Sequence, residues 1–349
     1  MKITTIVGAR PQFIKAAAIS RAISRRSGIE EAIIHTGQHF DANMSDVFFS
    51  ELKIPQPLHN LDIHGGAHGA MTGRMLKGIE DILIDEQTDI LLIYGDTNST
   101  LAGALAAAKL HIPVAHVEAG LRSFNRAMPE EVNRVVADHL SDLLLCPTFE
   151  AIKNLKNEGI TAGVHHVGDV MNDATLFARS IALKNSKILE RLNLSPGKYS
   201  VCTLHRAENT DDIDRLLRLV DFLEIESDGR PMLFPIHPRT KAVFVEHNIQ
   251  PKHLQLIDPV GYLDMNCLLA SATTVYTDSG GLQKEAYFHR VPCVTLREET
   301  EWVETINHGW NRLWQTDNYC TPRRDIPEYG DGSASDMIVD LLLAHSANL

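Results

Sequence analysis

The chain contains few cysteines and has a deficit of positive charge. It has 5 cysteines among 349 residues, and none is in C-x-x-C spacing. This argues against a disulfide framework or a cysteine zinc cage and indicates a reducing compartment. Lys and Arg number 33 against 45 Asp and Glu, for a net charge of −12. That balance argues against a general nucleic-acid or anionic-membrane binder, but not against an anionic small ligand held in a locally cationic pocket.

Long hydrophobic runs are also missing. The apolar runs at 2–8, 90–94 and 143–146 are far below the length that spans a bilayer, and the first is too short for a signal-peptide core. We therefore expect a cytoplasmic protein with no membrane partner.

Three cofactor and metal motifs are absent. No G-x-G-x-x-G follows a predicted strand, and neither G-x-x-x-x-G-K-[ST] nor H-E-x-x-H occurs. These absences argue against a dinucleotide fingerprint, a P-loop and a zincin site. We expect no bound cofactor and no required metal.

Short β-branched runs alternate with amphipathic segments of helical length. Strands are predicted at 2–8, 32–35, 89–94, 114–118, 143–146 and 165–167, and again at 199–203, 232–236, 254–257, 274–277 and 293–296. Helices are predicted at 13–25, 71–85, 101–110, 130–140 and 150–157, and then at 213–224, 262–271, 282–288 and 335–347. This is the rhythm of βα units on parallel sheets.

The predicted fold is α/β, with two Rossmann-like doubly wound parallel-sheet domains and a cleft between them. The first domain is expected at 1–168, the second at 169–333, and a C-terminal helix at 334–349 that packs back on the first domain. Since ligands of such sheets bind beyond the carboxyl ends of the strands, the cleft is the expected active site.

Two strand ends have the features of anion sites. After the first strand comes G-A-R-P-Q-F-I-K, in which Pro11 suits the first helical position and Arg10 and Lys15 add positive charge near the helix start. After the strand at 274–277 comes D-S-G-G-L-Q-K-E, where the glycines let backbone amides approach a ligand. Each segment can equally be an ordinary βα turn, but a nucleoside diphosphate between the domains would use both.

Carboxylates gather at strand ends in the first half. Asp96 follows the strand at 89–94, Glu118 ends the next strand, and Glu130 opens the helix that contains Arg134. Asp96 can also be a helix cap, and Glu130 with Arg134 an i,i+4 surface pair. Carboxylates crowded beside cations are suited to general acid–base catalysis. In the second half, His205 and His237 each follow a strand. Each can donate a hydrogen bond to a phosphate, or can simply be a loop residue.

Six motifs, taken in order, resemble those of the non-hydrolysing UDP-N-acetylglucosamine 2-epimerases over residues 2 to about 310. They are G-A-R-P-Q-F-I-K, G-D-T-N-S, H-V-E-A-G-L-R-S, P-E-E-V-N-R, L-H-R-A-E-N and D-S-G-G-L-Q-K-E. The resemblance implies a glycosyltransferase-B-like fold, a homodimer and no cofactor. It also implies conversion of UDP-GlcNAc to UDP-ManNAc by anti elimination of UDP to a glycal and re-addition, for cell-surface polysaccharide precursors.

The resemblance also assigns roles to residues. It gives catalytic roles to Asp96, Glu118, Glu130, Arg134 and His205, and UDP contacts to Arg10, Lys15, His237, Ser279, Gly280, Gly281 and Glu285.

Two departures point to a branch of that family. Ala9 and Gln12 stand where the common start is G-T-R-P-E, and the segment 36–44 is longer than in many members. In several members this stretch belongs to an allosteric site, so Gln38 and His39 are its candidates here. Both departures resemble the branch acting on UDP-2,3-diacetamido-2,3-dideoxy-glucuronate, whose extra carboxylate needs a cation such as Arg122 or Arg126.

Two rival functions fit the same architecture. A retaining glycosyltransferase would transfer the sugar to an acceptor, and a non-catalytic sensor would bind the UDP-sugar unchanged. The carboxylate set favours epimerisation, since a transferase has less need of a proton-abstracting cluster.

Overall fold

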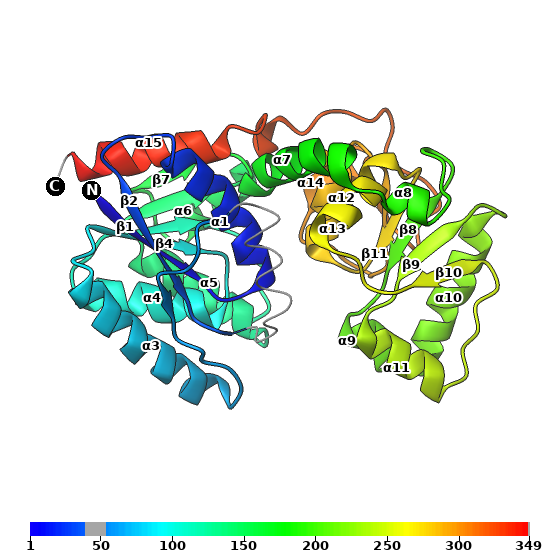
Figure 1. Cartoon of the computed structure of the whole chain (residues 1–349), viewed down its shortest axis with the longest axis horizontal. Helices are drawn as coiled ribbons and strands as arrows, with labels where there is room; N and C mark the ends of the chain where they lie inside the picture. Colours follow the sequence, from blue (N-terminus) through cyan, green and yellow to red (C-terminus); the bar gives the residue numbers. More distant parts are fainter. Residues whose placement is uncertain (39–53, 348–349) are drawn as a thin grey trace. The chain divides into compact units, whose positions relative to one another are not determined.

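A computed structural model describes residues 1–38 and 54–347 of the chain. The chain divides into two compact units, Met1–Ala174 with Pro327–Leu349 and Thr175–Ile326. Each unit contains one parallel sheet flanked by helices, as Figure 1 shows. The predicted α/β class with two parallel-sheet domains is confirmed.

Unit 1 is built on a 7-stranded sheet in the order β3-β2-β1-β4-β5-β6-β7. Its strands are β1 (Lys2–Val7), β2 (Glu30–His35), β3 (His59–Asn60), β4 (Ile90–Tyr94), β5 (Val114–Val117), β6 (Leu143–Cys146) and β7 (Val164–His166). The order reverses between β1 and β4, and at such a reversal a crevice opens beyond the carboxyl ends of the strands. The loops after β1, β4 and β5 therefore occupy the position where ligands bind in doubly wound sheets.

The helices of unit 1 are α1 (Arg10–Ile23), α3 (His68–Asp85), α4 (Asn98–Lys109), α5 (Pro129–Leu140), α6 (Phe149–Asn157) and α15 (Ala334–Ser346), with a 3₁₀ turn at Pro327–Tyr329. Helices α3, α4 and α5 pack side by side under the sheet in Figure 1. Small residues let α4 lie close to the sheet. A Cβ on Gly103 would lie 2.6 Å from Cδ1 of Ile6 on β1. Close packing of this kind holds α4 against the sheet strands β1 and β4.

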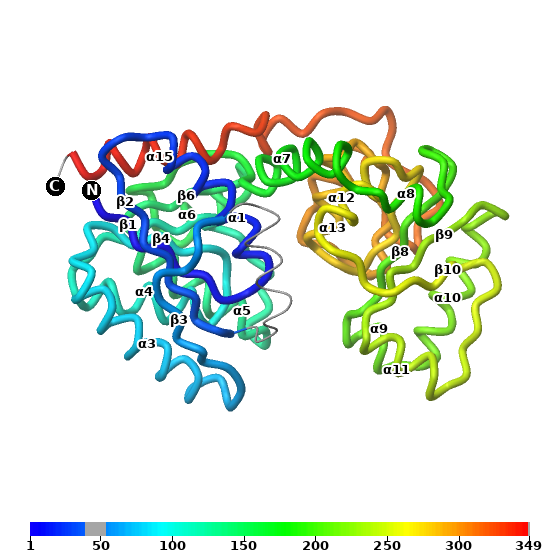
Figure 2. Tube along the Cα trace, in the orientation of Figure 1, coloured from blue at the N-terminus to red at the C-terminus, as the bar shows by residue number. Residues whose placement is uncertain are grey.

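Helix α15 packs against α1, as the tube in Figure 2 shows. An ion pair of 2.9 Å joins Arg25, just beyond the end of α1, to Asp336 of α15. The buried Asp173 carboxylate accepts hydrogen bonds from the Ser335 amide (2.7 Å) and hydroxyl (2.6 Å). These bonds satisfy donors that a helix start leaves without partners.

Unit 2 is built on a 6-stranded sheet in the order β10-β9-β8-β11-β12-β13. Its strands are β8 (Ser200–Thr203), β9 (Met232–Pro235), β10 (Leu254–Ile257), β11 (Val275–Thr277), β12 (Cys293–Thr295) and β13 (Asn311–Leu313). The helices are α7 (Val170–Asn185), which contains the unit boundary, α8 (Ile188–Arg191), α9 (Ala207–Thr210), α10 (Ile213–Ser227), α11 (Pro238–Glu246), α12 (Tyr262–Ser271), α13 (Gly280–Phe288) and α14 (Val303–Asn307). The strand order here reverses between β8 and β11.

Two strands, β3 and β13, are not predicted by the sequence. They contain only 2 and 3 residues, with the sequences H-N and N-R-L. Neither has the β-branched run that marks a strand, and each is extended because it pairs with a neighbour, β2 or β12. Strand conformation at these positions is imposed by tertiary pairing.

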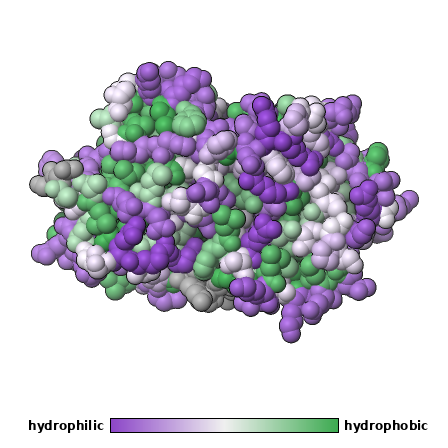
Figure 3. All heavy atoms as spheres, turned by 90° about the horizontal axis from the view of Figure 1, so that it is seen from above, coloured by the Kyte–Doolittle hydropathy of each residue, from purple (hydrophilic) through white to green (hydrophobic). Residues whose placement is uncertain are grey.

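The surface is chemically mixed. On the face drawn in Figure 3, hydrophilic and hydrophobic residues are interspersed in small groups. Among the described residues, no helix combines the length and apolar composition needed to cross a bilayer.

Candidate functional site

In unit 1, Lys15 and Glu118 form an ion pair at the strand reversal. The two side chains are 9% and 13% exposed. Glu118 directly follows β5 with a φ of +71°, a left-handed conformation that is uncommon for a residue other than glycine. Non-glycine residues in this conformation carry strain and cluster at functional sites.

Asp96 pairs with Arg134, which α5 supplies. The cap of α4 is Thr97, whose hydroxyl accepts from the Thr100 amide, so Asp96 is not the capping residue. Burial lowers the pKa of Arg134, but three nearby carboxylates raise it above its ordinary value, with Asp96 contributing most. The Asp96 carboxylate thus faces a permanent cation.

Arg134 pairs with Glu131 and not with Glu130. The distance from the Arg134 guanidinium to Glu131 Oε2 is 2.8 Å. Burial raises the pKa of Glu131, but hydrogen bonds from the Ser123 and Phe124 amides outweigh it and lower the pKa. Glu130 is exposed in the first turn of α5. The alternative of a Glu130–Arg134 surface pair is therefore wrong, and a catalytic role for Glu130 stays a prediction.

Gln12 connects the start of α1 to the turn after β4. Its Oε1 accepts from the Gly8 amide (2.8 Å) and the Ala9 amide (3.1 Å), and its Nε2 donates to the Tyr94 carbonyl (2.8 Å). A glutamate could make the first two bonds but could not donate to the carbonyl when ionised. Gln12, where the family's common start has Glu, thus makes a hydrogen bond that an ionised Glu could not make.

The remaining candidates of unit 1 lie around this centre. Arg10 is exposed at the first residue of α1. The Oε1 atom of Gln38 accepts from the amide and hydroxyl of Ser99 at 3.1 and 2.8 Å, at the start of α4. His39 lies outside the described residues.

The side chain of Arg122 is buried and paired within the protein, which argues against the suggestion that it meets a substrate carboxylate. It is 1% exposed and donates to Asp138 at 2.6 Å and to Glu158 at 2.7 Å. The two carboxylates already balance the charge of this guanidinium. Of the two arginines considered, only Arg126 is exposed.

In unit 2, Asp278 organises the loop that carries His205. This carboxylate is fully buried after β11, and its Oδ2 accepts from the amides of His205 and Arg206, both at 2.8 Å. Its Oδ1 lies 3.2 Å from Nδ1 of His205. Asp278 therefore holds the backbone of the loop and places a carboxylate oxygen beside the ring of the histidine, a part of the site that sequence reasoning did not assign.

His205 and His237 lie together at the ends of β8 and β9. Their ring centroids are 5.6 Å apart. His237 caps α11, with Nδ1 accepting from the Arg239 amide at 3.2 Å. Burial, with the charge of nearby His205 and Arg239, lowers the pKa of His237. Since Nδ1 accepts, His237 carries its proton on Nε2 and presents a donor there.

Helix α13 begins at the carboxyl end of β11 with Ser279 as its cap and Gly280 as its first residue. A Cβ on Gly280 would lie 2.3 Å from Oε1 of Glu301, whereas one on Gly281 would meet no atom of the protein closer than 4.0 Å. The Gly281 side of the helix start is therefore open to a ligand, and the helix dipole favours an anion there. Glu285 is buried one turn further on.

Arg297, beyond the end of β12, is another residue that sequence reasoning missed. It contacts Glu208 at 3.1 Å and Glu301 at 2.8 Å. Burial raises the pKa of Glu301, but Arg297 outweighs it and lowers the pKa. The only available sequence signal was that an arginine directly follows a predicted strand. Asp278, by contrast, stands inside the motif D-S-G-G-L-Q-K-E.

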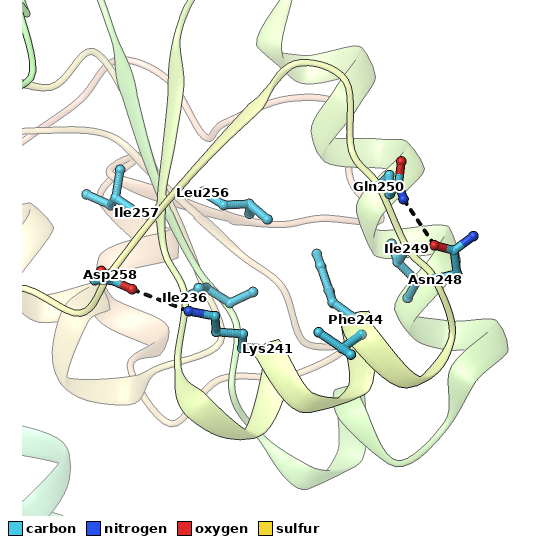
Figure 4. A pocket seen from close by; sticks show the side chains of 10 residues that line it. Ile236, Lys241, Phe244, Asn248, Ile249, Gln250, Leu256, Ile257 and Asp258 are labelled. Atoms are coloured by element: carbon cyan, nitrogen blue, oxygen red, sulfur yellow. Dashed lines mark hydrogen bonds and ion pairs between the residues drawn. The ribbon is translucent and has the colours of Figure 1, made fainter.

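A pocket of about 630 Å³ lies in unit 2 between α11 and the end of β10. Figure 4 shows its apolar floor, which includes Ile236 and Phe244, and the 3.4 Å contact of Lys241 with Asp258 at its edge. Its lining contains neither His205 nor any part of the α13 start. The pocket is therefore separate from the polar strand-end groups described above.

Comparison with known proteins agrees with this geometry. The model of the UDP-N-acetylglucosamine 2-epimerase family matches residues 21–343. The chain belongs to this family. It is accordingly an isomerase, as the motifs predicted.

Relatives carrying two different substrate names are similar to the chain over almost its whole length. A UDP-N-acetylglucosamine 2-epimerase homolog of Methanococcus maripaludis is 52% identical, covering 98% of this chain and 99% of its own. The UDP-2,3-diacetamido-2,3-dideoxy-D-glucuronate 2-epimerase of Pseudomonas aeruginosa is 51% identical, with the same coverage.

A solved structure has the same fold. The UDP-GlcNAc 2-epimerase of Methanocaldococcus jannaschii, in complex with UDP-GlcNAc and UDP, matches with a TM-score of 0.87 and 43% identity, over 99% of this chain and 100% of that one.

Proposed function

We propose that this epimerase converts UDP-GlcNAc to UDP-ManNAc by eliminating UDP to a glycal intermediate and adding it back after protonation of the opposite face. The observation that carries the proposal is the pair of strand-end carboxylates in unit 1, each held by its own cation: Glu118 by Lys15 and Asp96 by Arg134. An epimerisation needs one group to accept a proton and one to donate it, and this arrangement supplies two.

Unit 2 provides the groups for the leaving diphosphate. The open start of α13 at Ser279, Gly280 and Gly281 favours an anion, and His205 and His237 add hydrogen-bond donors nearby. Glu285, buried behind that helix start, is our candidate for the ribose hydroxyls. Arg10 and Lys15 of unit 1 complete the proposed set of UDP contacts.

The decisive experiment is incubation with UDP-GlcNAc in D2O. Elimination and re-addition place deuterium at the carbon that bears the acetamido group, which NMR of the sugar detects. Turnover without deuterium would overturn the proposal and favour a glycosyltransferase. Tight binding with neither turnover nor exchange would identify a sensor.

A second substrate deserves testing because a named diacetamido-glucuronate epimerase is 51% identical to this chain. A panel comparing kcat/KM for UDP-GlcNAc and UDP-2,3-diacetamido-2,3-dideoxy-glucuronate separates the two. If the uronic acid is preferred, Arg126→Gln is expected to reduce that preference, whereas a variant of the buried Arg122 would act on the fold.

We infer further that the protein is a cytoplasmic homodimer. Helix α5 exposes Val132 (46%) and Val136 (37%), which lie one turn apart and are suited to an apolar contact. Light scattering after size exclusion tests the dimer, with Val136→Glu expected to favour the monomer. Cell fractionation tests the location.

A further inference from the structure

A fully buried histidine, His116 on β5, lies beneath the candidate acid–base groups. Its Nε2 is 2.7 Å from the Gly95 carbonyl oxygen, and its Nδ1 is 2.7 Å from Oδ1 of Asp138. Gly95 is the residue before Asp96, and His116 stands two residues before Glu118. The His116 ring therefore contacts the backbone next to Asp96, and His116 belongs to the strand that Glu118 follows.

Gly95 is held by β5 at both of its backbone polar groups. Its amide donates to the Val117 carbonyl at 3.0 Å, and its carbonyl faces His116. With a φ of +61°, Gly95 adopts a turn that a side chain would strain. A Cβ added to Gly95 would lie 3.5 Å from Oε2 of Glu118 and 3.7 Å from Nζ of Lys15, so this turn lies next to the ion pair.

Asp138 of α5 links the turn after β4 to the turn after β5. One oxygen faces His116, while the other accepts from the Gly120 amide at 3.1 Å and from Arg122 at 2.6 Å. Through His116 it reaches Gly95, and through Gly120 it reaches the backbone just beyond Glu118. A single carboxylate thereby connects the two turns that carry Asp96 and Glu118.

The partners assign the protons of His116. A carbonyl oxygen can only accept, so Nε2 carries a proton. The other oxygen of Asp138 accepts from the Gly120 amide at 3.1 Å and from the Arg122 guanidinium at 2.6 Å, and this ion pair keeps the carboxylate ionised, so it can also only accept. Nδ1 must therefore carry a proton as well. The positive His116 and Arg122 are balanced by the negative Asp138 and Glu158.

We infer that His116 is a buried imidazolium that, with Asp138, positions the Asp96 and Glu118 turns for catalysis. It is a positioning residue, since it acts through the Gly95 carbonyl and not on the substrate. The inference rests on the proposed epimerase function for its kinetic consequence, but its protonation state can be measured independently of activity.

NMR of the 15N-histidine-labelled wild-type protein measures that state directly. We expect one buried histidine to show two protonated ring nitrogens at neutral pH, and to lose this signature in Asp138→Asn. His289 provides an internal comparison: it is buried, it contacts Asn266 at 3.0 Å, and burial lowers its pKa to about 3, so its ring is neutral. A neutral His116 at neutral pH would overturn the inference, whatever the enzyme's substrate.

Two variants separate positioning from mere stability. His116→Gln can still place an amide donor near the Gly95 carbonyl, whereas His116→Asn can reach only Asp138. We expect His116→Asn to lose about 10- to 100-fold in kcat, as when the partner that orients a functional group is removed, and His116→Gln to retain about tenfold more activity. The affinity for UDP should change less than about twofold in both, because kcat alone reports the reacting geometry.

The matched control is His289→Gln, a buried substitution in unit 2 that belongs to neither of these turns and should leave kcat unchanged. The positioning role would be overturned if His116→Asn had the same kcat as His116→Gln, or if both variants had the wild-type kcat. If neither variant folds, the NMR measurement on the wild-type protein still decides the inference. Failure of wild-type epimerisation in D2O would instead contradict the proposed function and leave the NMR result standing.

Discussion

The Lys15 ammonium ion pairs with the Glu118 carboxylate, and the two side chains are almost closed off from solvent. Lys15 comes from the helix after β1 and Glu118 from the end of β5, with β4 between these strands in the sheet. The sequence motifs associate Lys15 with the nucleotide. The structure adds a direct contact to the carboxylate proposed for proton transfer.

Lys15→Met should therefore lower kcat by about 100-fold or more, because Glu118 loses the cation that holds its charge and position. The affinity for UDP should fall less than kcat, since most proposed diphosphate contacts lie in unit 2. Steady-state kinetics and calorimetric UDP titration test this. Lys77→Gln is the control, because Lys77 is 77% exposed and pairs with an exposed aspartate. A loss confined to UDP affinity would leave Lys15 as a nucleotide contact only and would contradict its role in holding Glu118.

Asp96→Asn should reduce kcat by about 1000-fold while leaving UDP affinity within about threefold, because the amide cannot exchange a proton as the carboxylate does. Asp81→Asn on α3 is the matched control, since Asp81 is 57% exposed in a surface ion pair. Kinetics and UDP binding should be measured on both variants. Activity of Asp96→Asn near the wild-type level would remove Asp96 from the mechanism.

Gln12→Glu should destabilise the protein by about 1–3 kcal/mol at neutral pH, because an ionised carboxylate would face the Tyr94 carbonyl without a proton to donate. Such a carboxylate has a raised folded pKa, so its protonated form restores stability as the pH falls. Urea unfolding at neutral and mildly acidic pH measures both effects. Gln255→Glu on the exposed face of β10 should show neither. Equal stability of both variants at neutral pH would refute the explanation of Gln12.

His289 should contribute to acid destabilisation. Burial lowers its folded pKa to about 3, so the unfolded chain binds its proton first as the pH drops through the ordinary histidine value. The resulting loss between about pH 7 and about pH 5 is roughly 2 kcal/mol. His289→Gln should lack that part of the pH dependence in urea unfolding, whereas His253→Gln, at an exposed position, should keep it. If the free energy of unfolding had the same pH dependence in His289→Gln and in the wild type, the contribution assigned to His289 would be contradicted.

Much of the fold follows from local pattern, and the exceptions have a common cause. The strands β4 (I-L-L-I-Y) and β9 (M-L-F-P) are continuous apolar runs because both faces of a parallel sheet are buried, so these strands can be located from the sequence. The short β3 and β13 lack such runs and exist through pairing. Arg122 illustrates the same limit at the site: its charge suggested a ligand, but its burial between two carboxylates is decided by residues far away in the chain.

The α/β class, the family and the strand-end motifs can be predicted from residue types at fixed spacing in the chain. The partners of the site residues come from the folded structure: Lys15 with Glu118, Arg134 with Asp96 and Glu131, and His116 between Gly95 and Asp138. Hydrogen bonds and ion pairs act over a few ångströms, and parallel strands bring together residues that the chain separates by a whole βα unit.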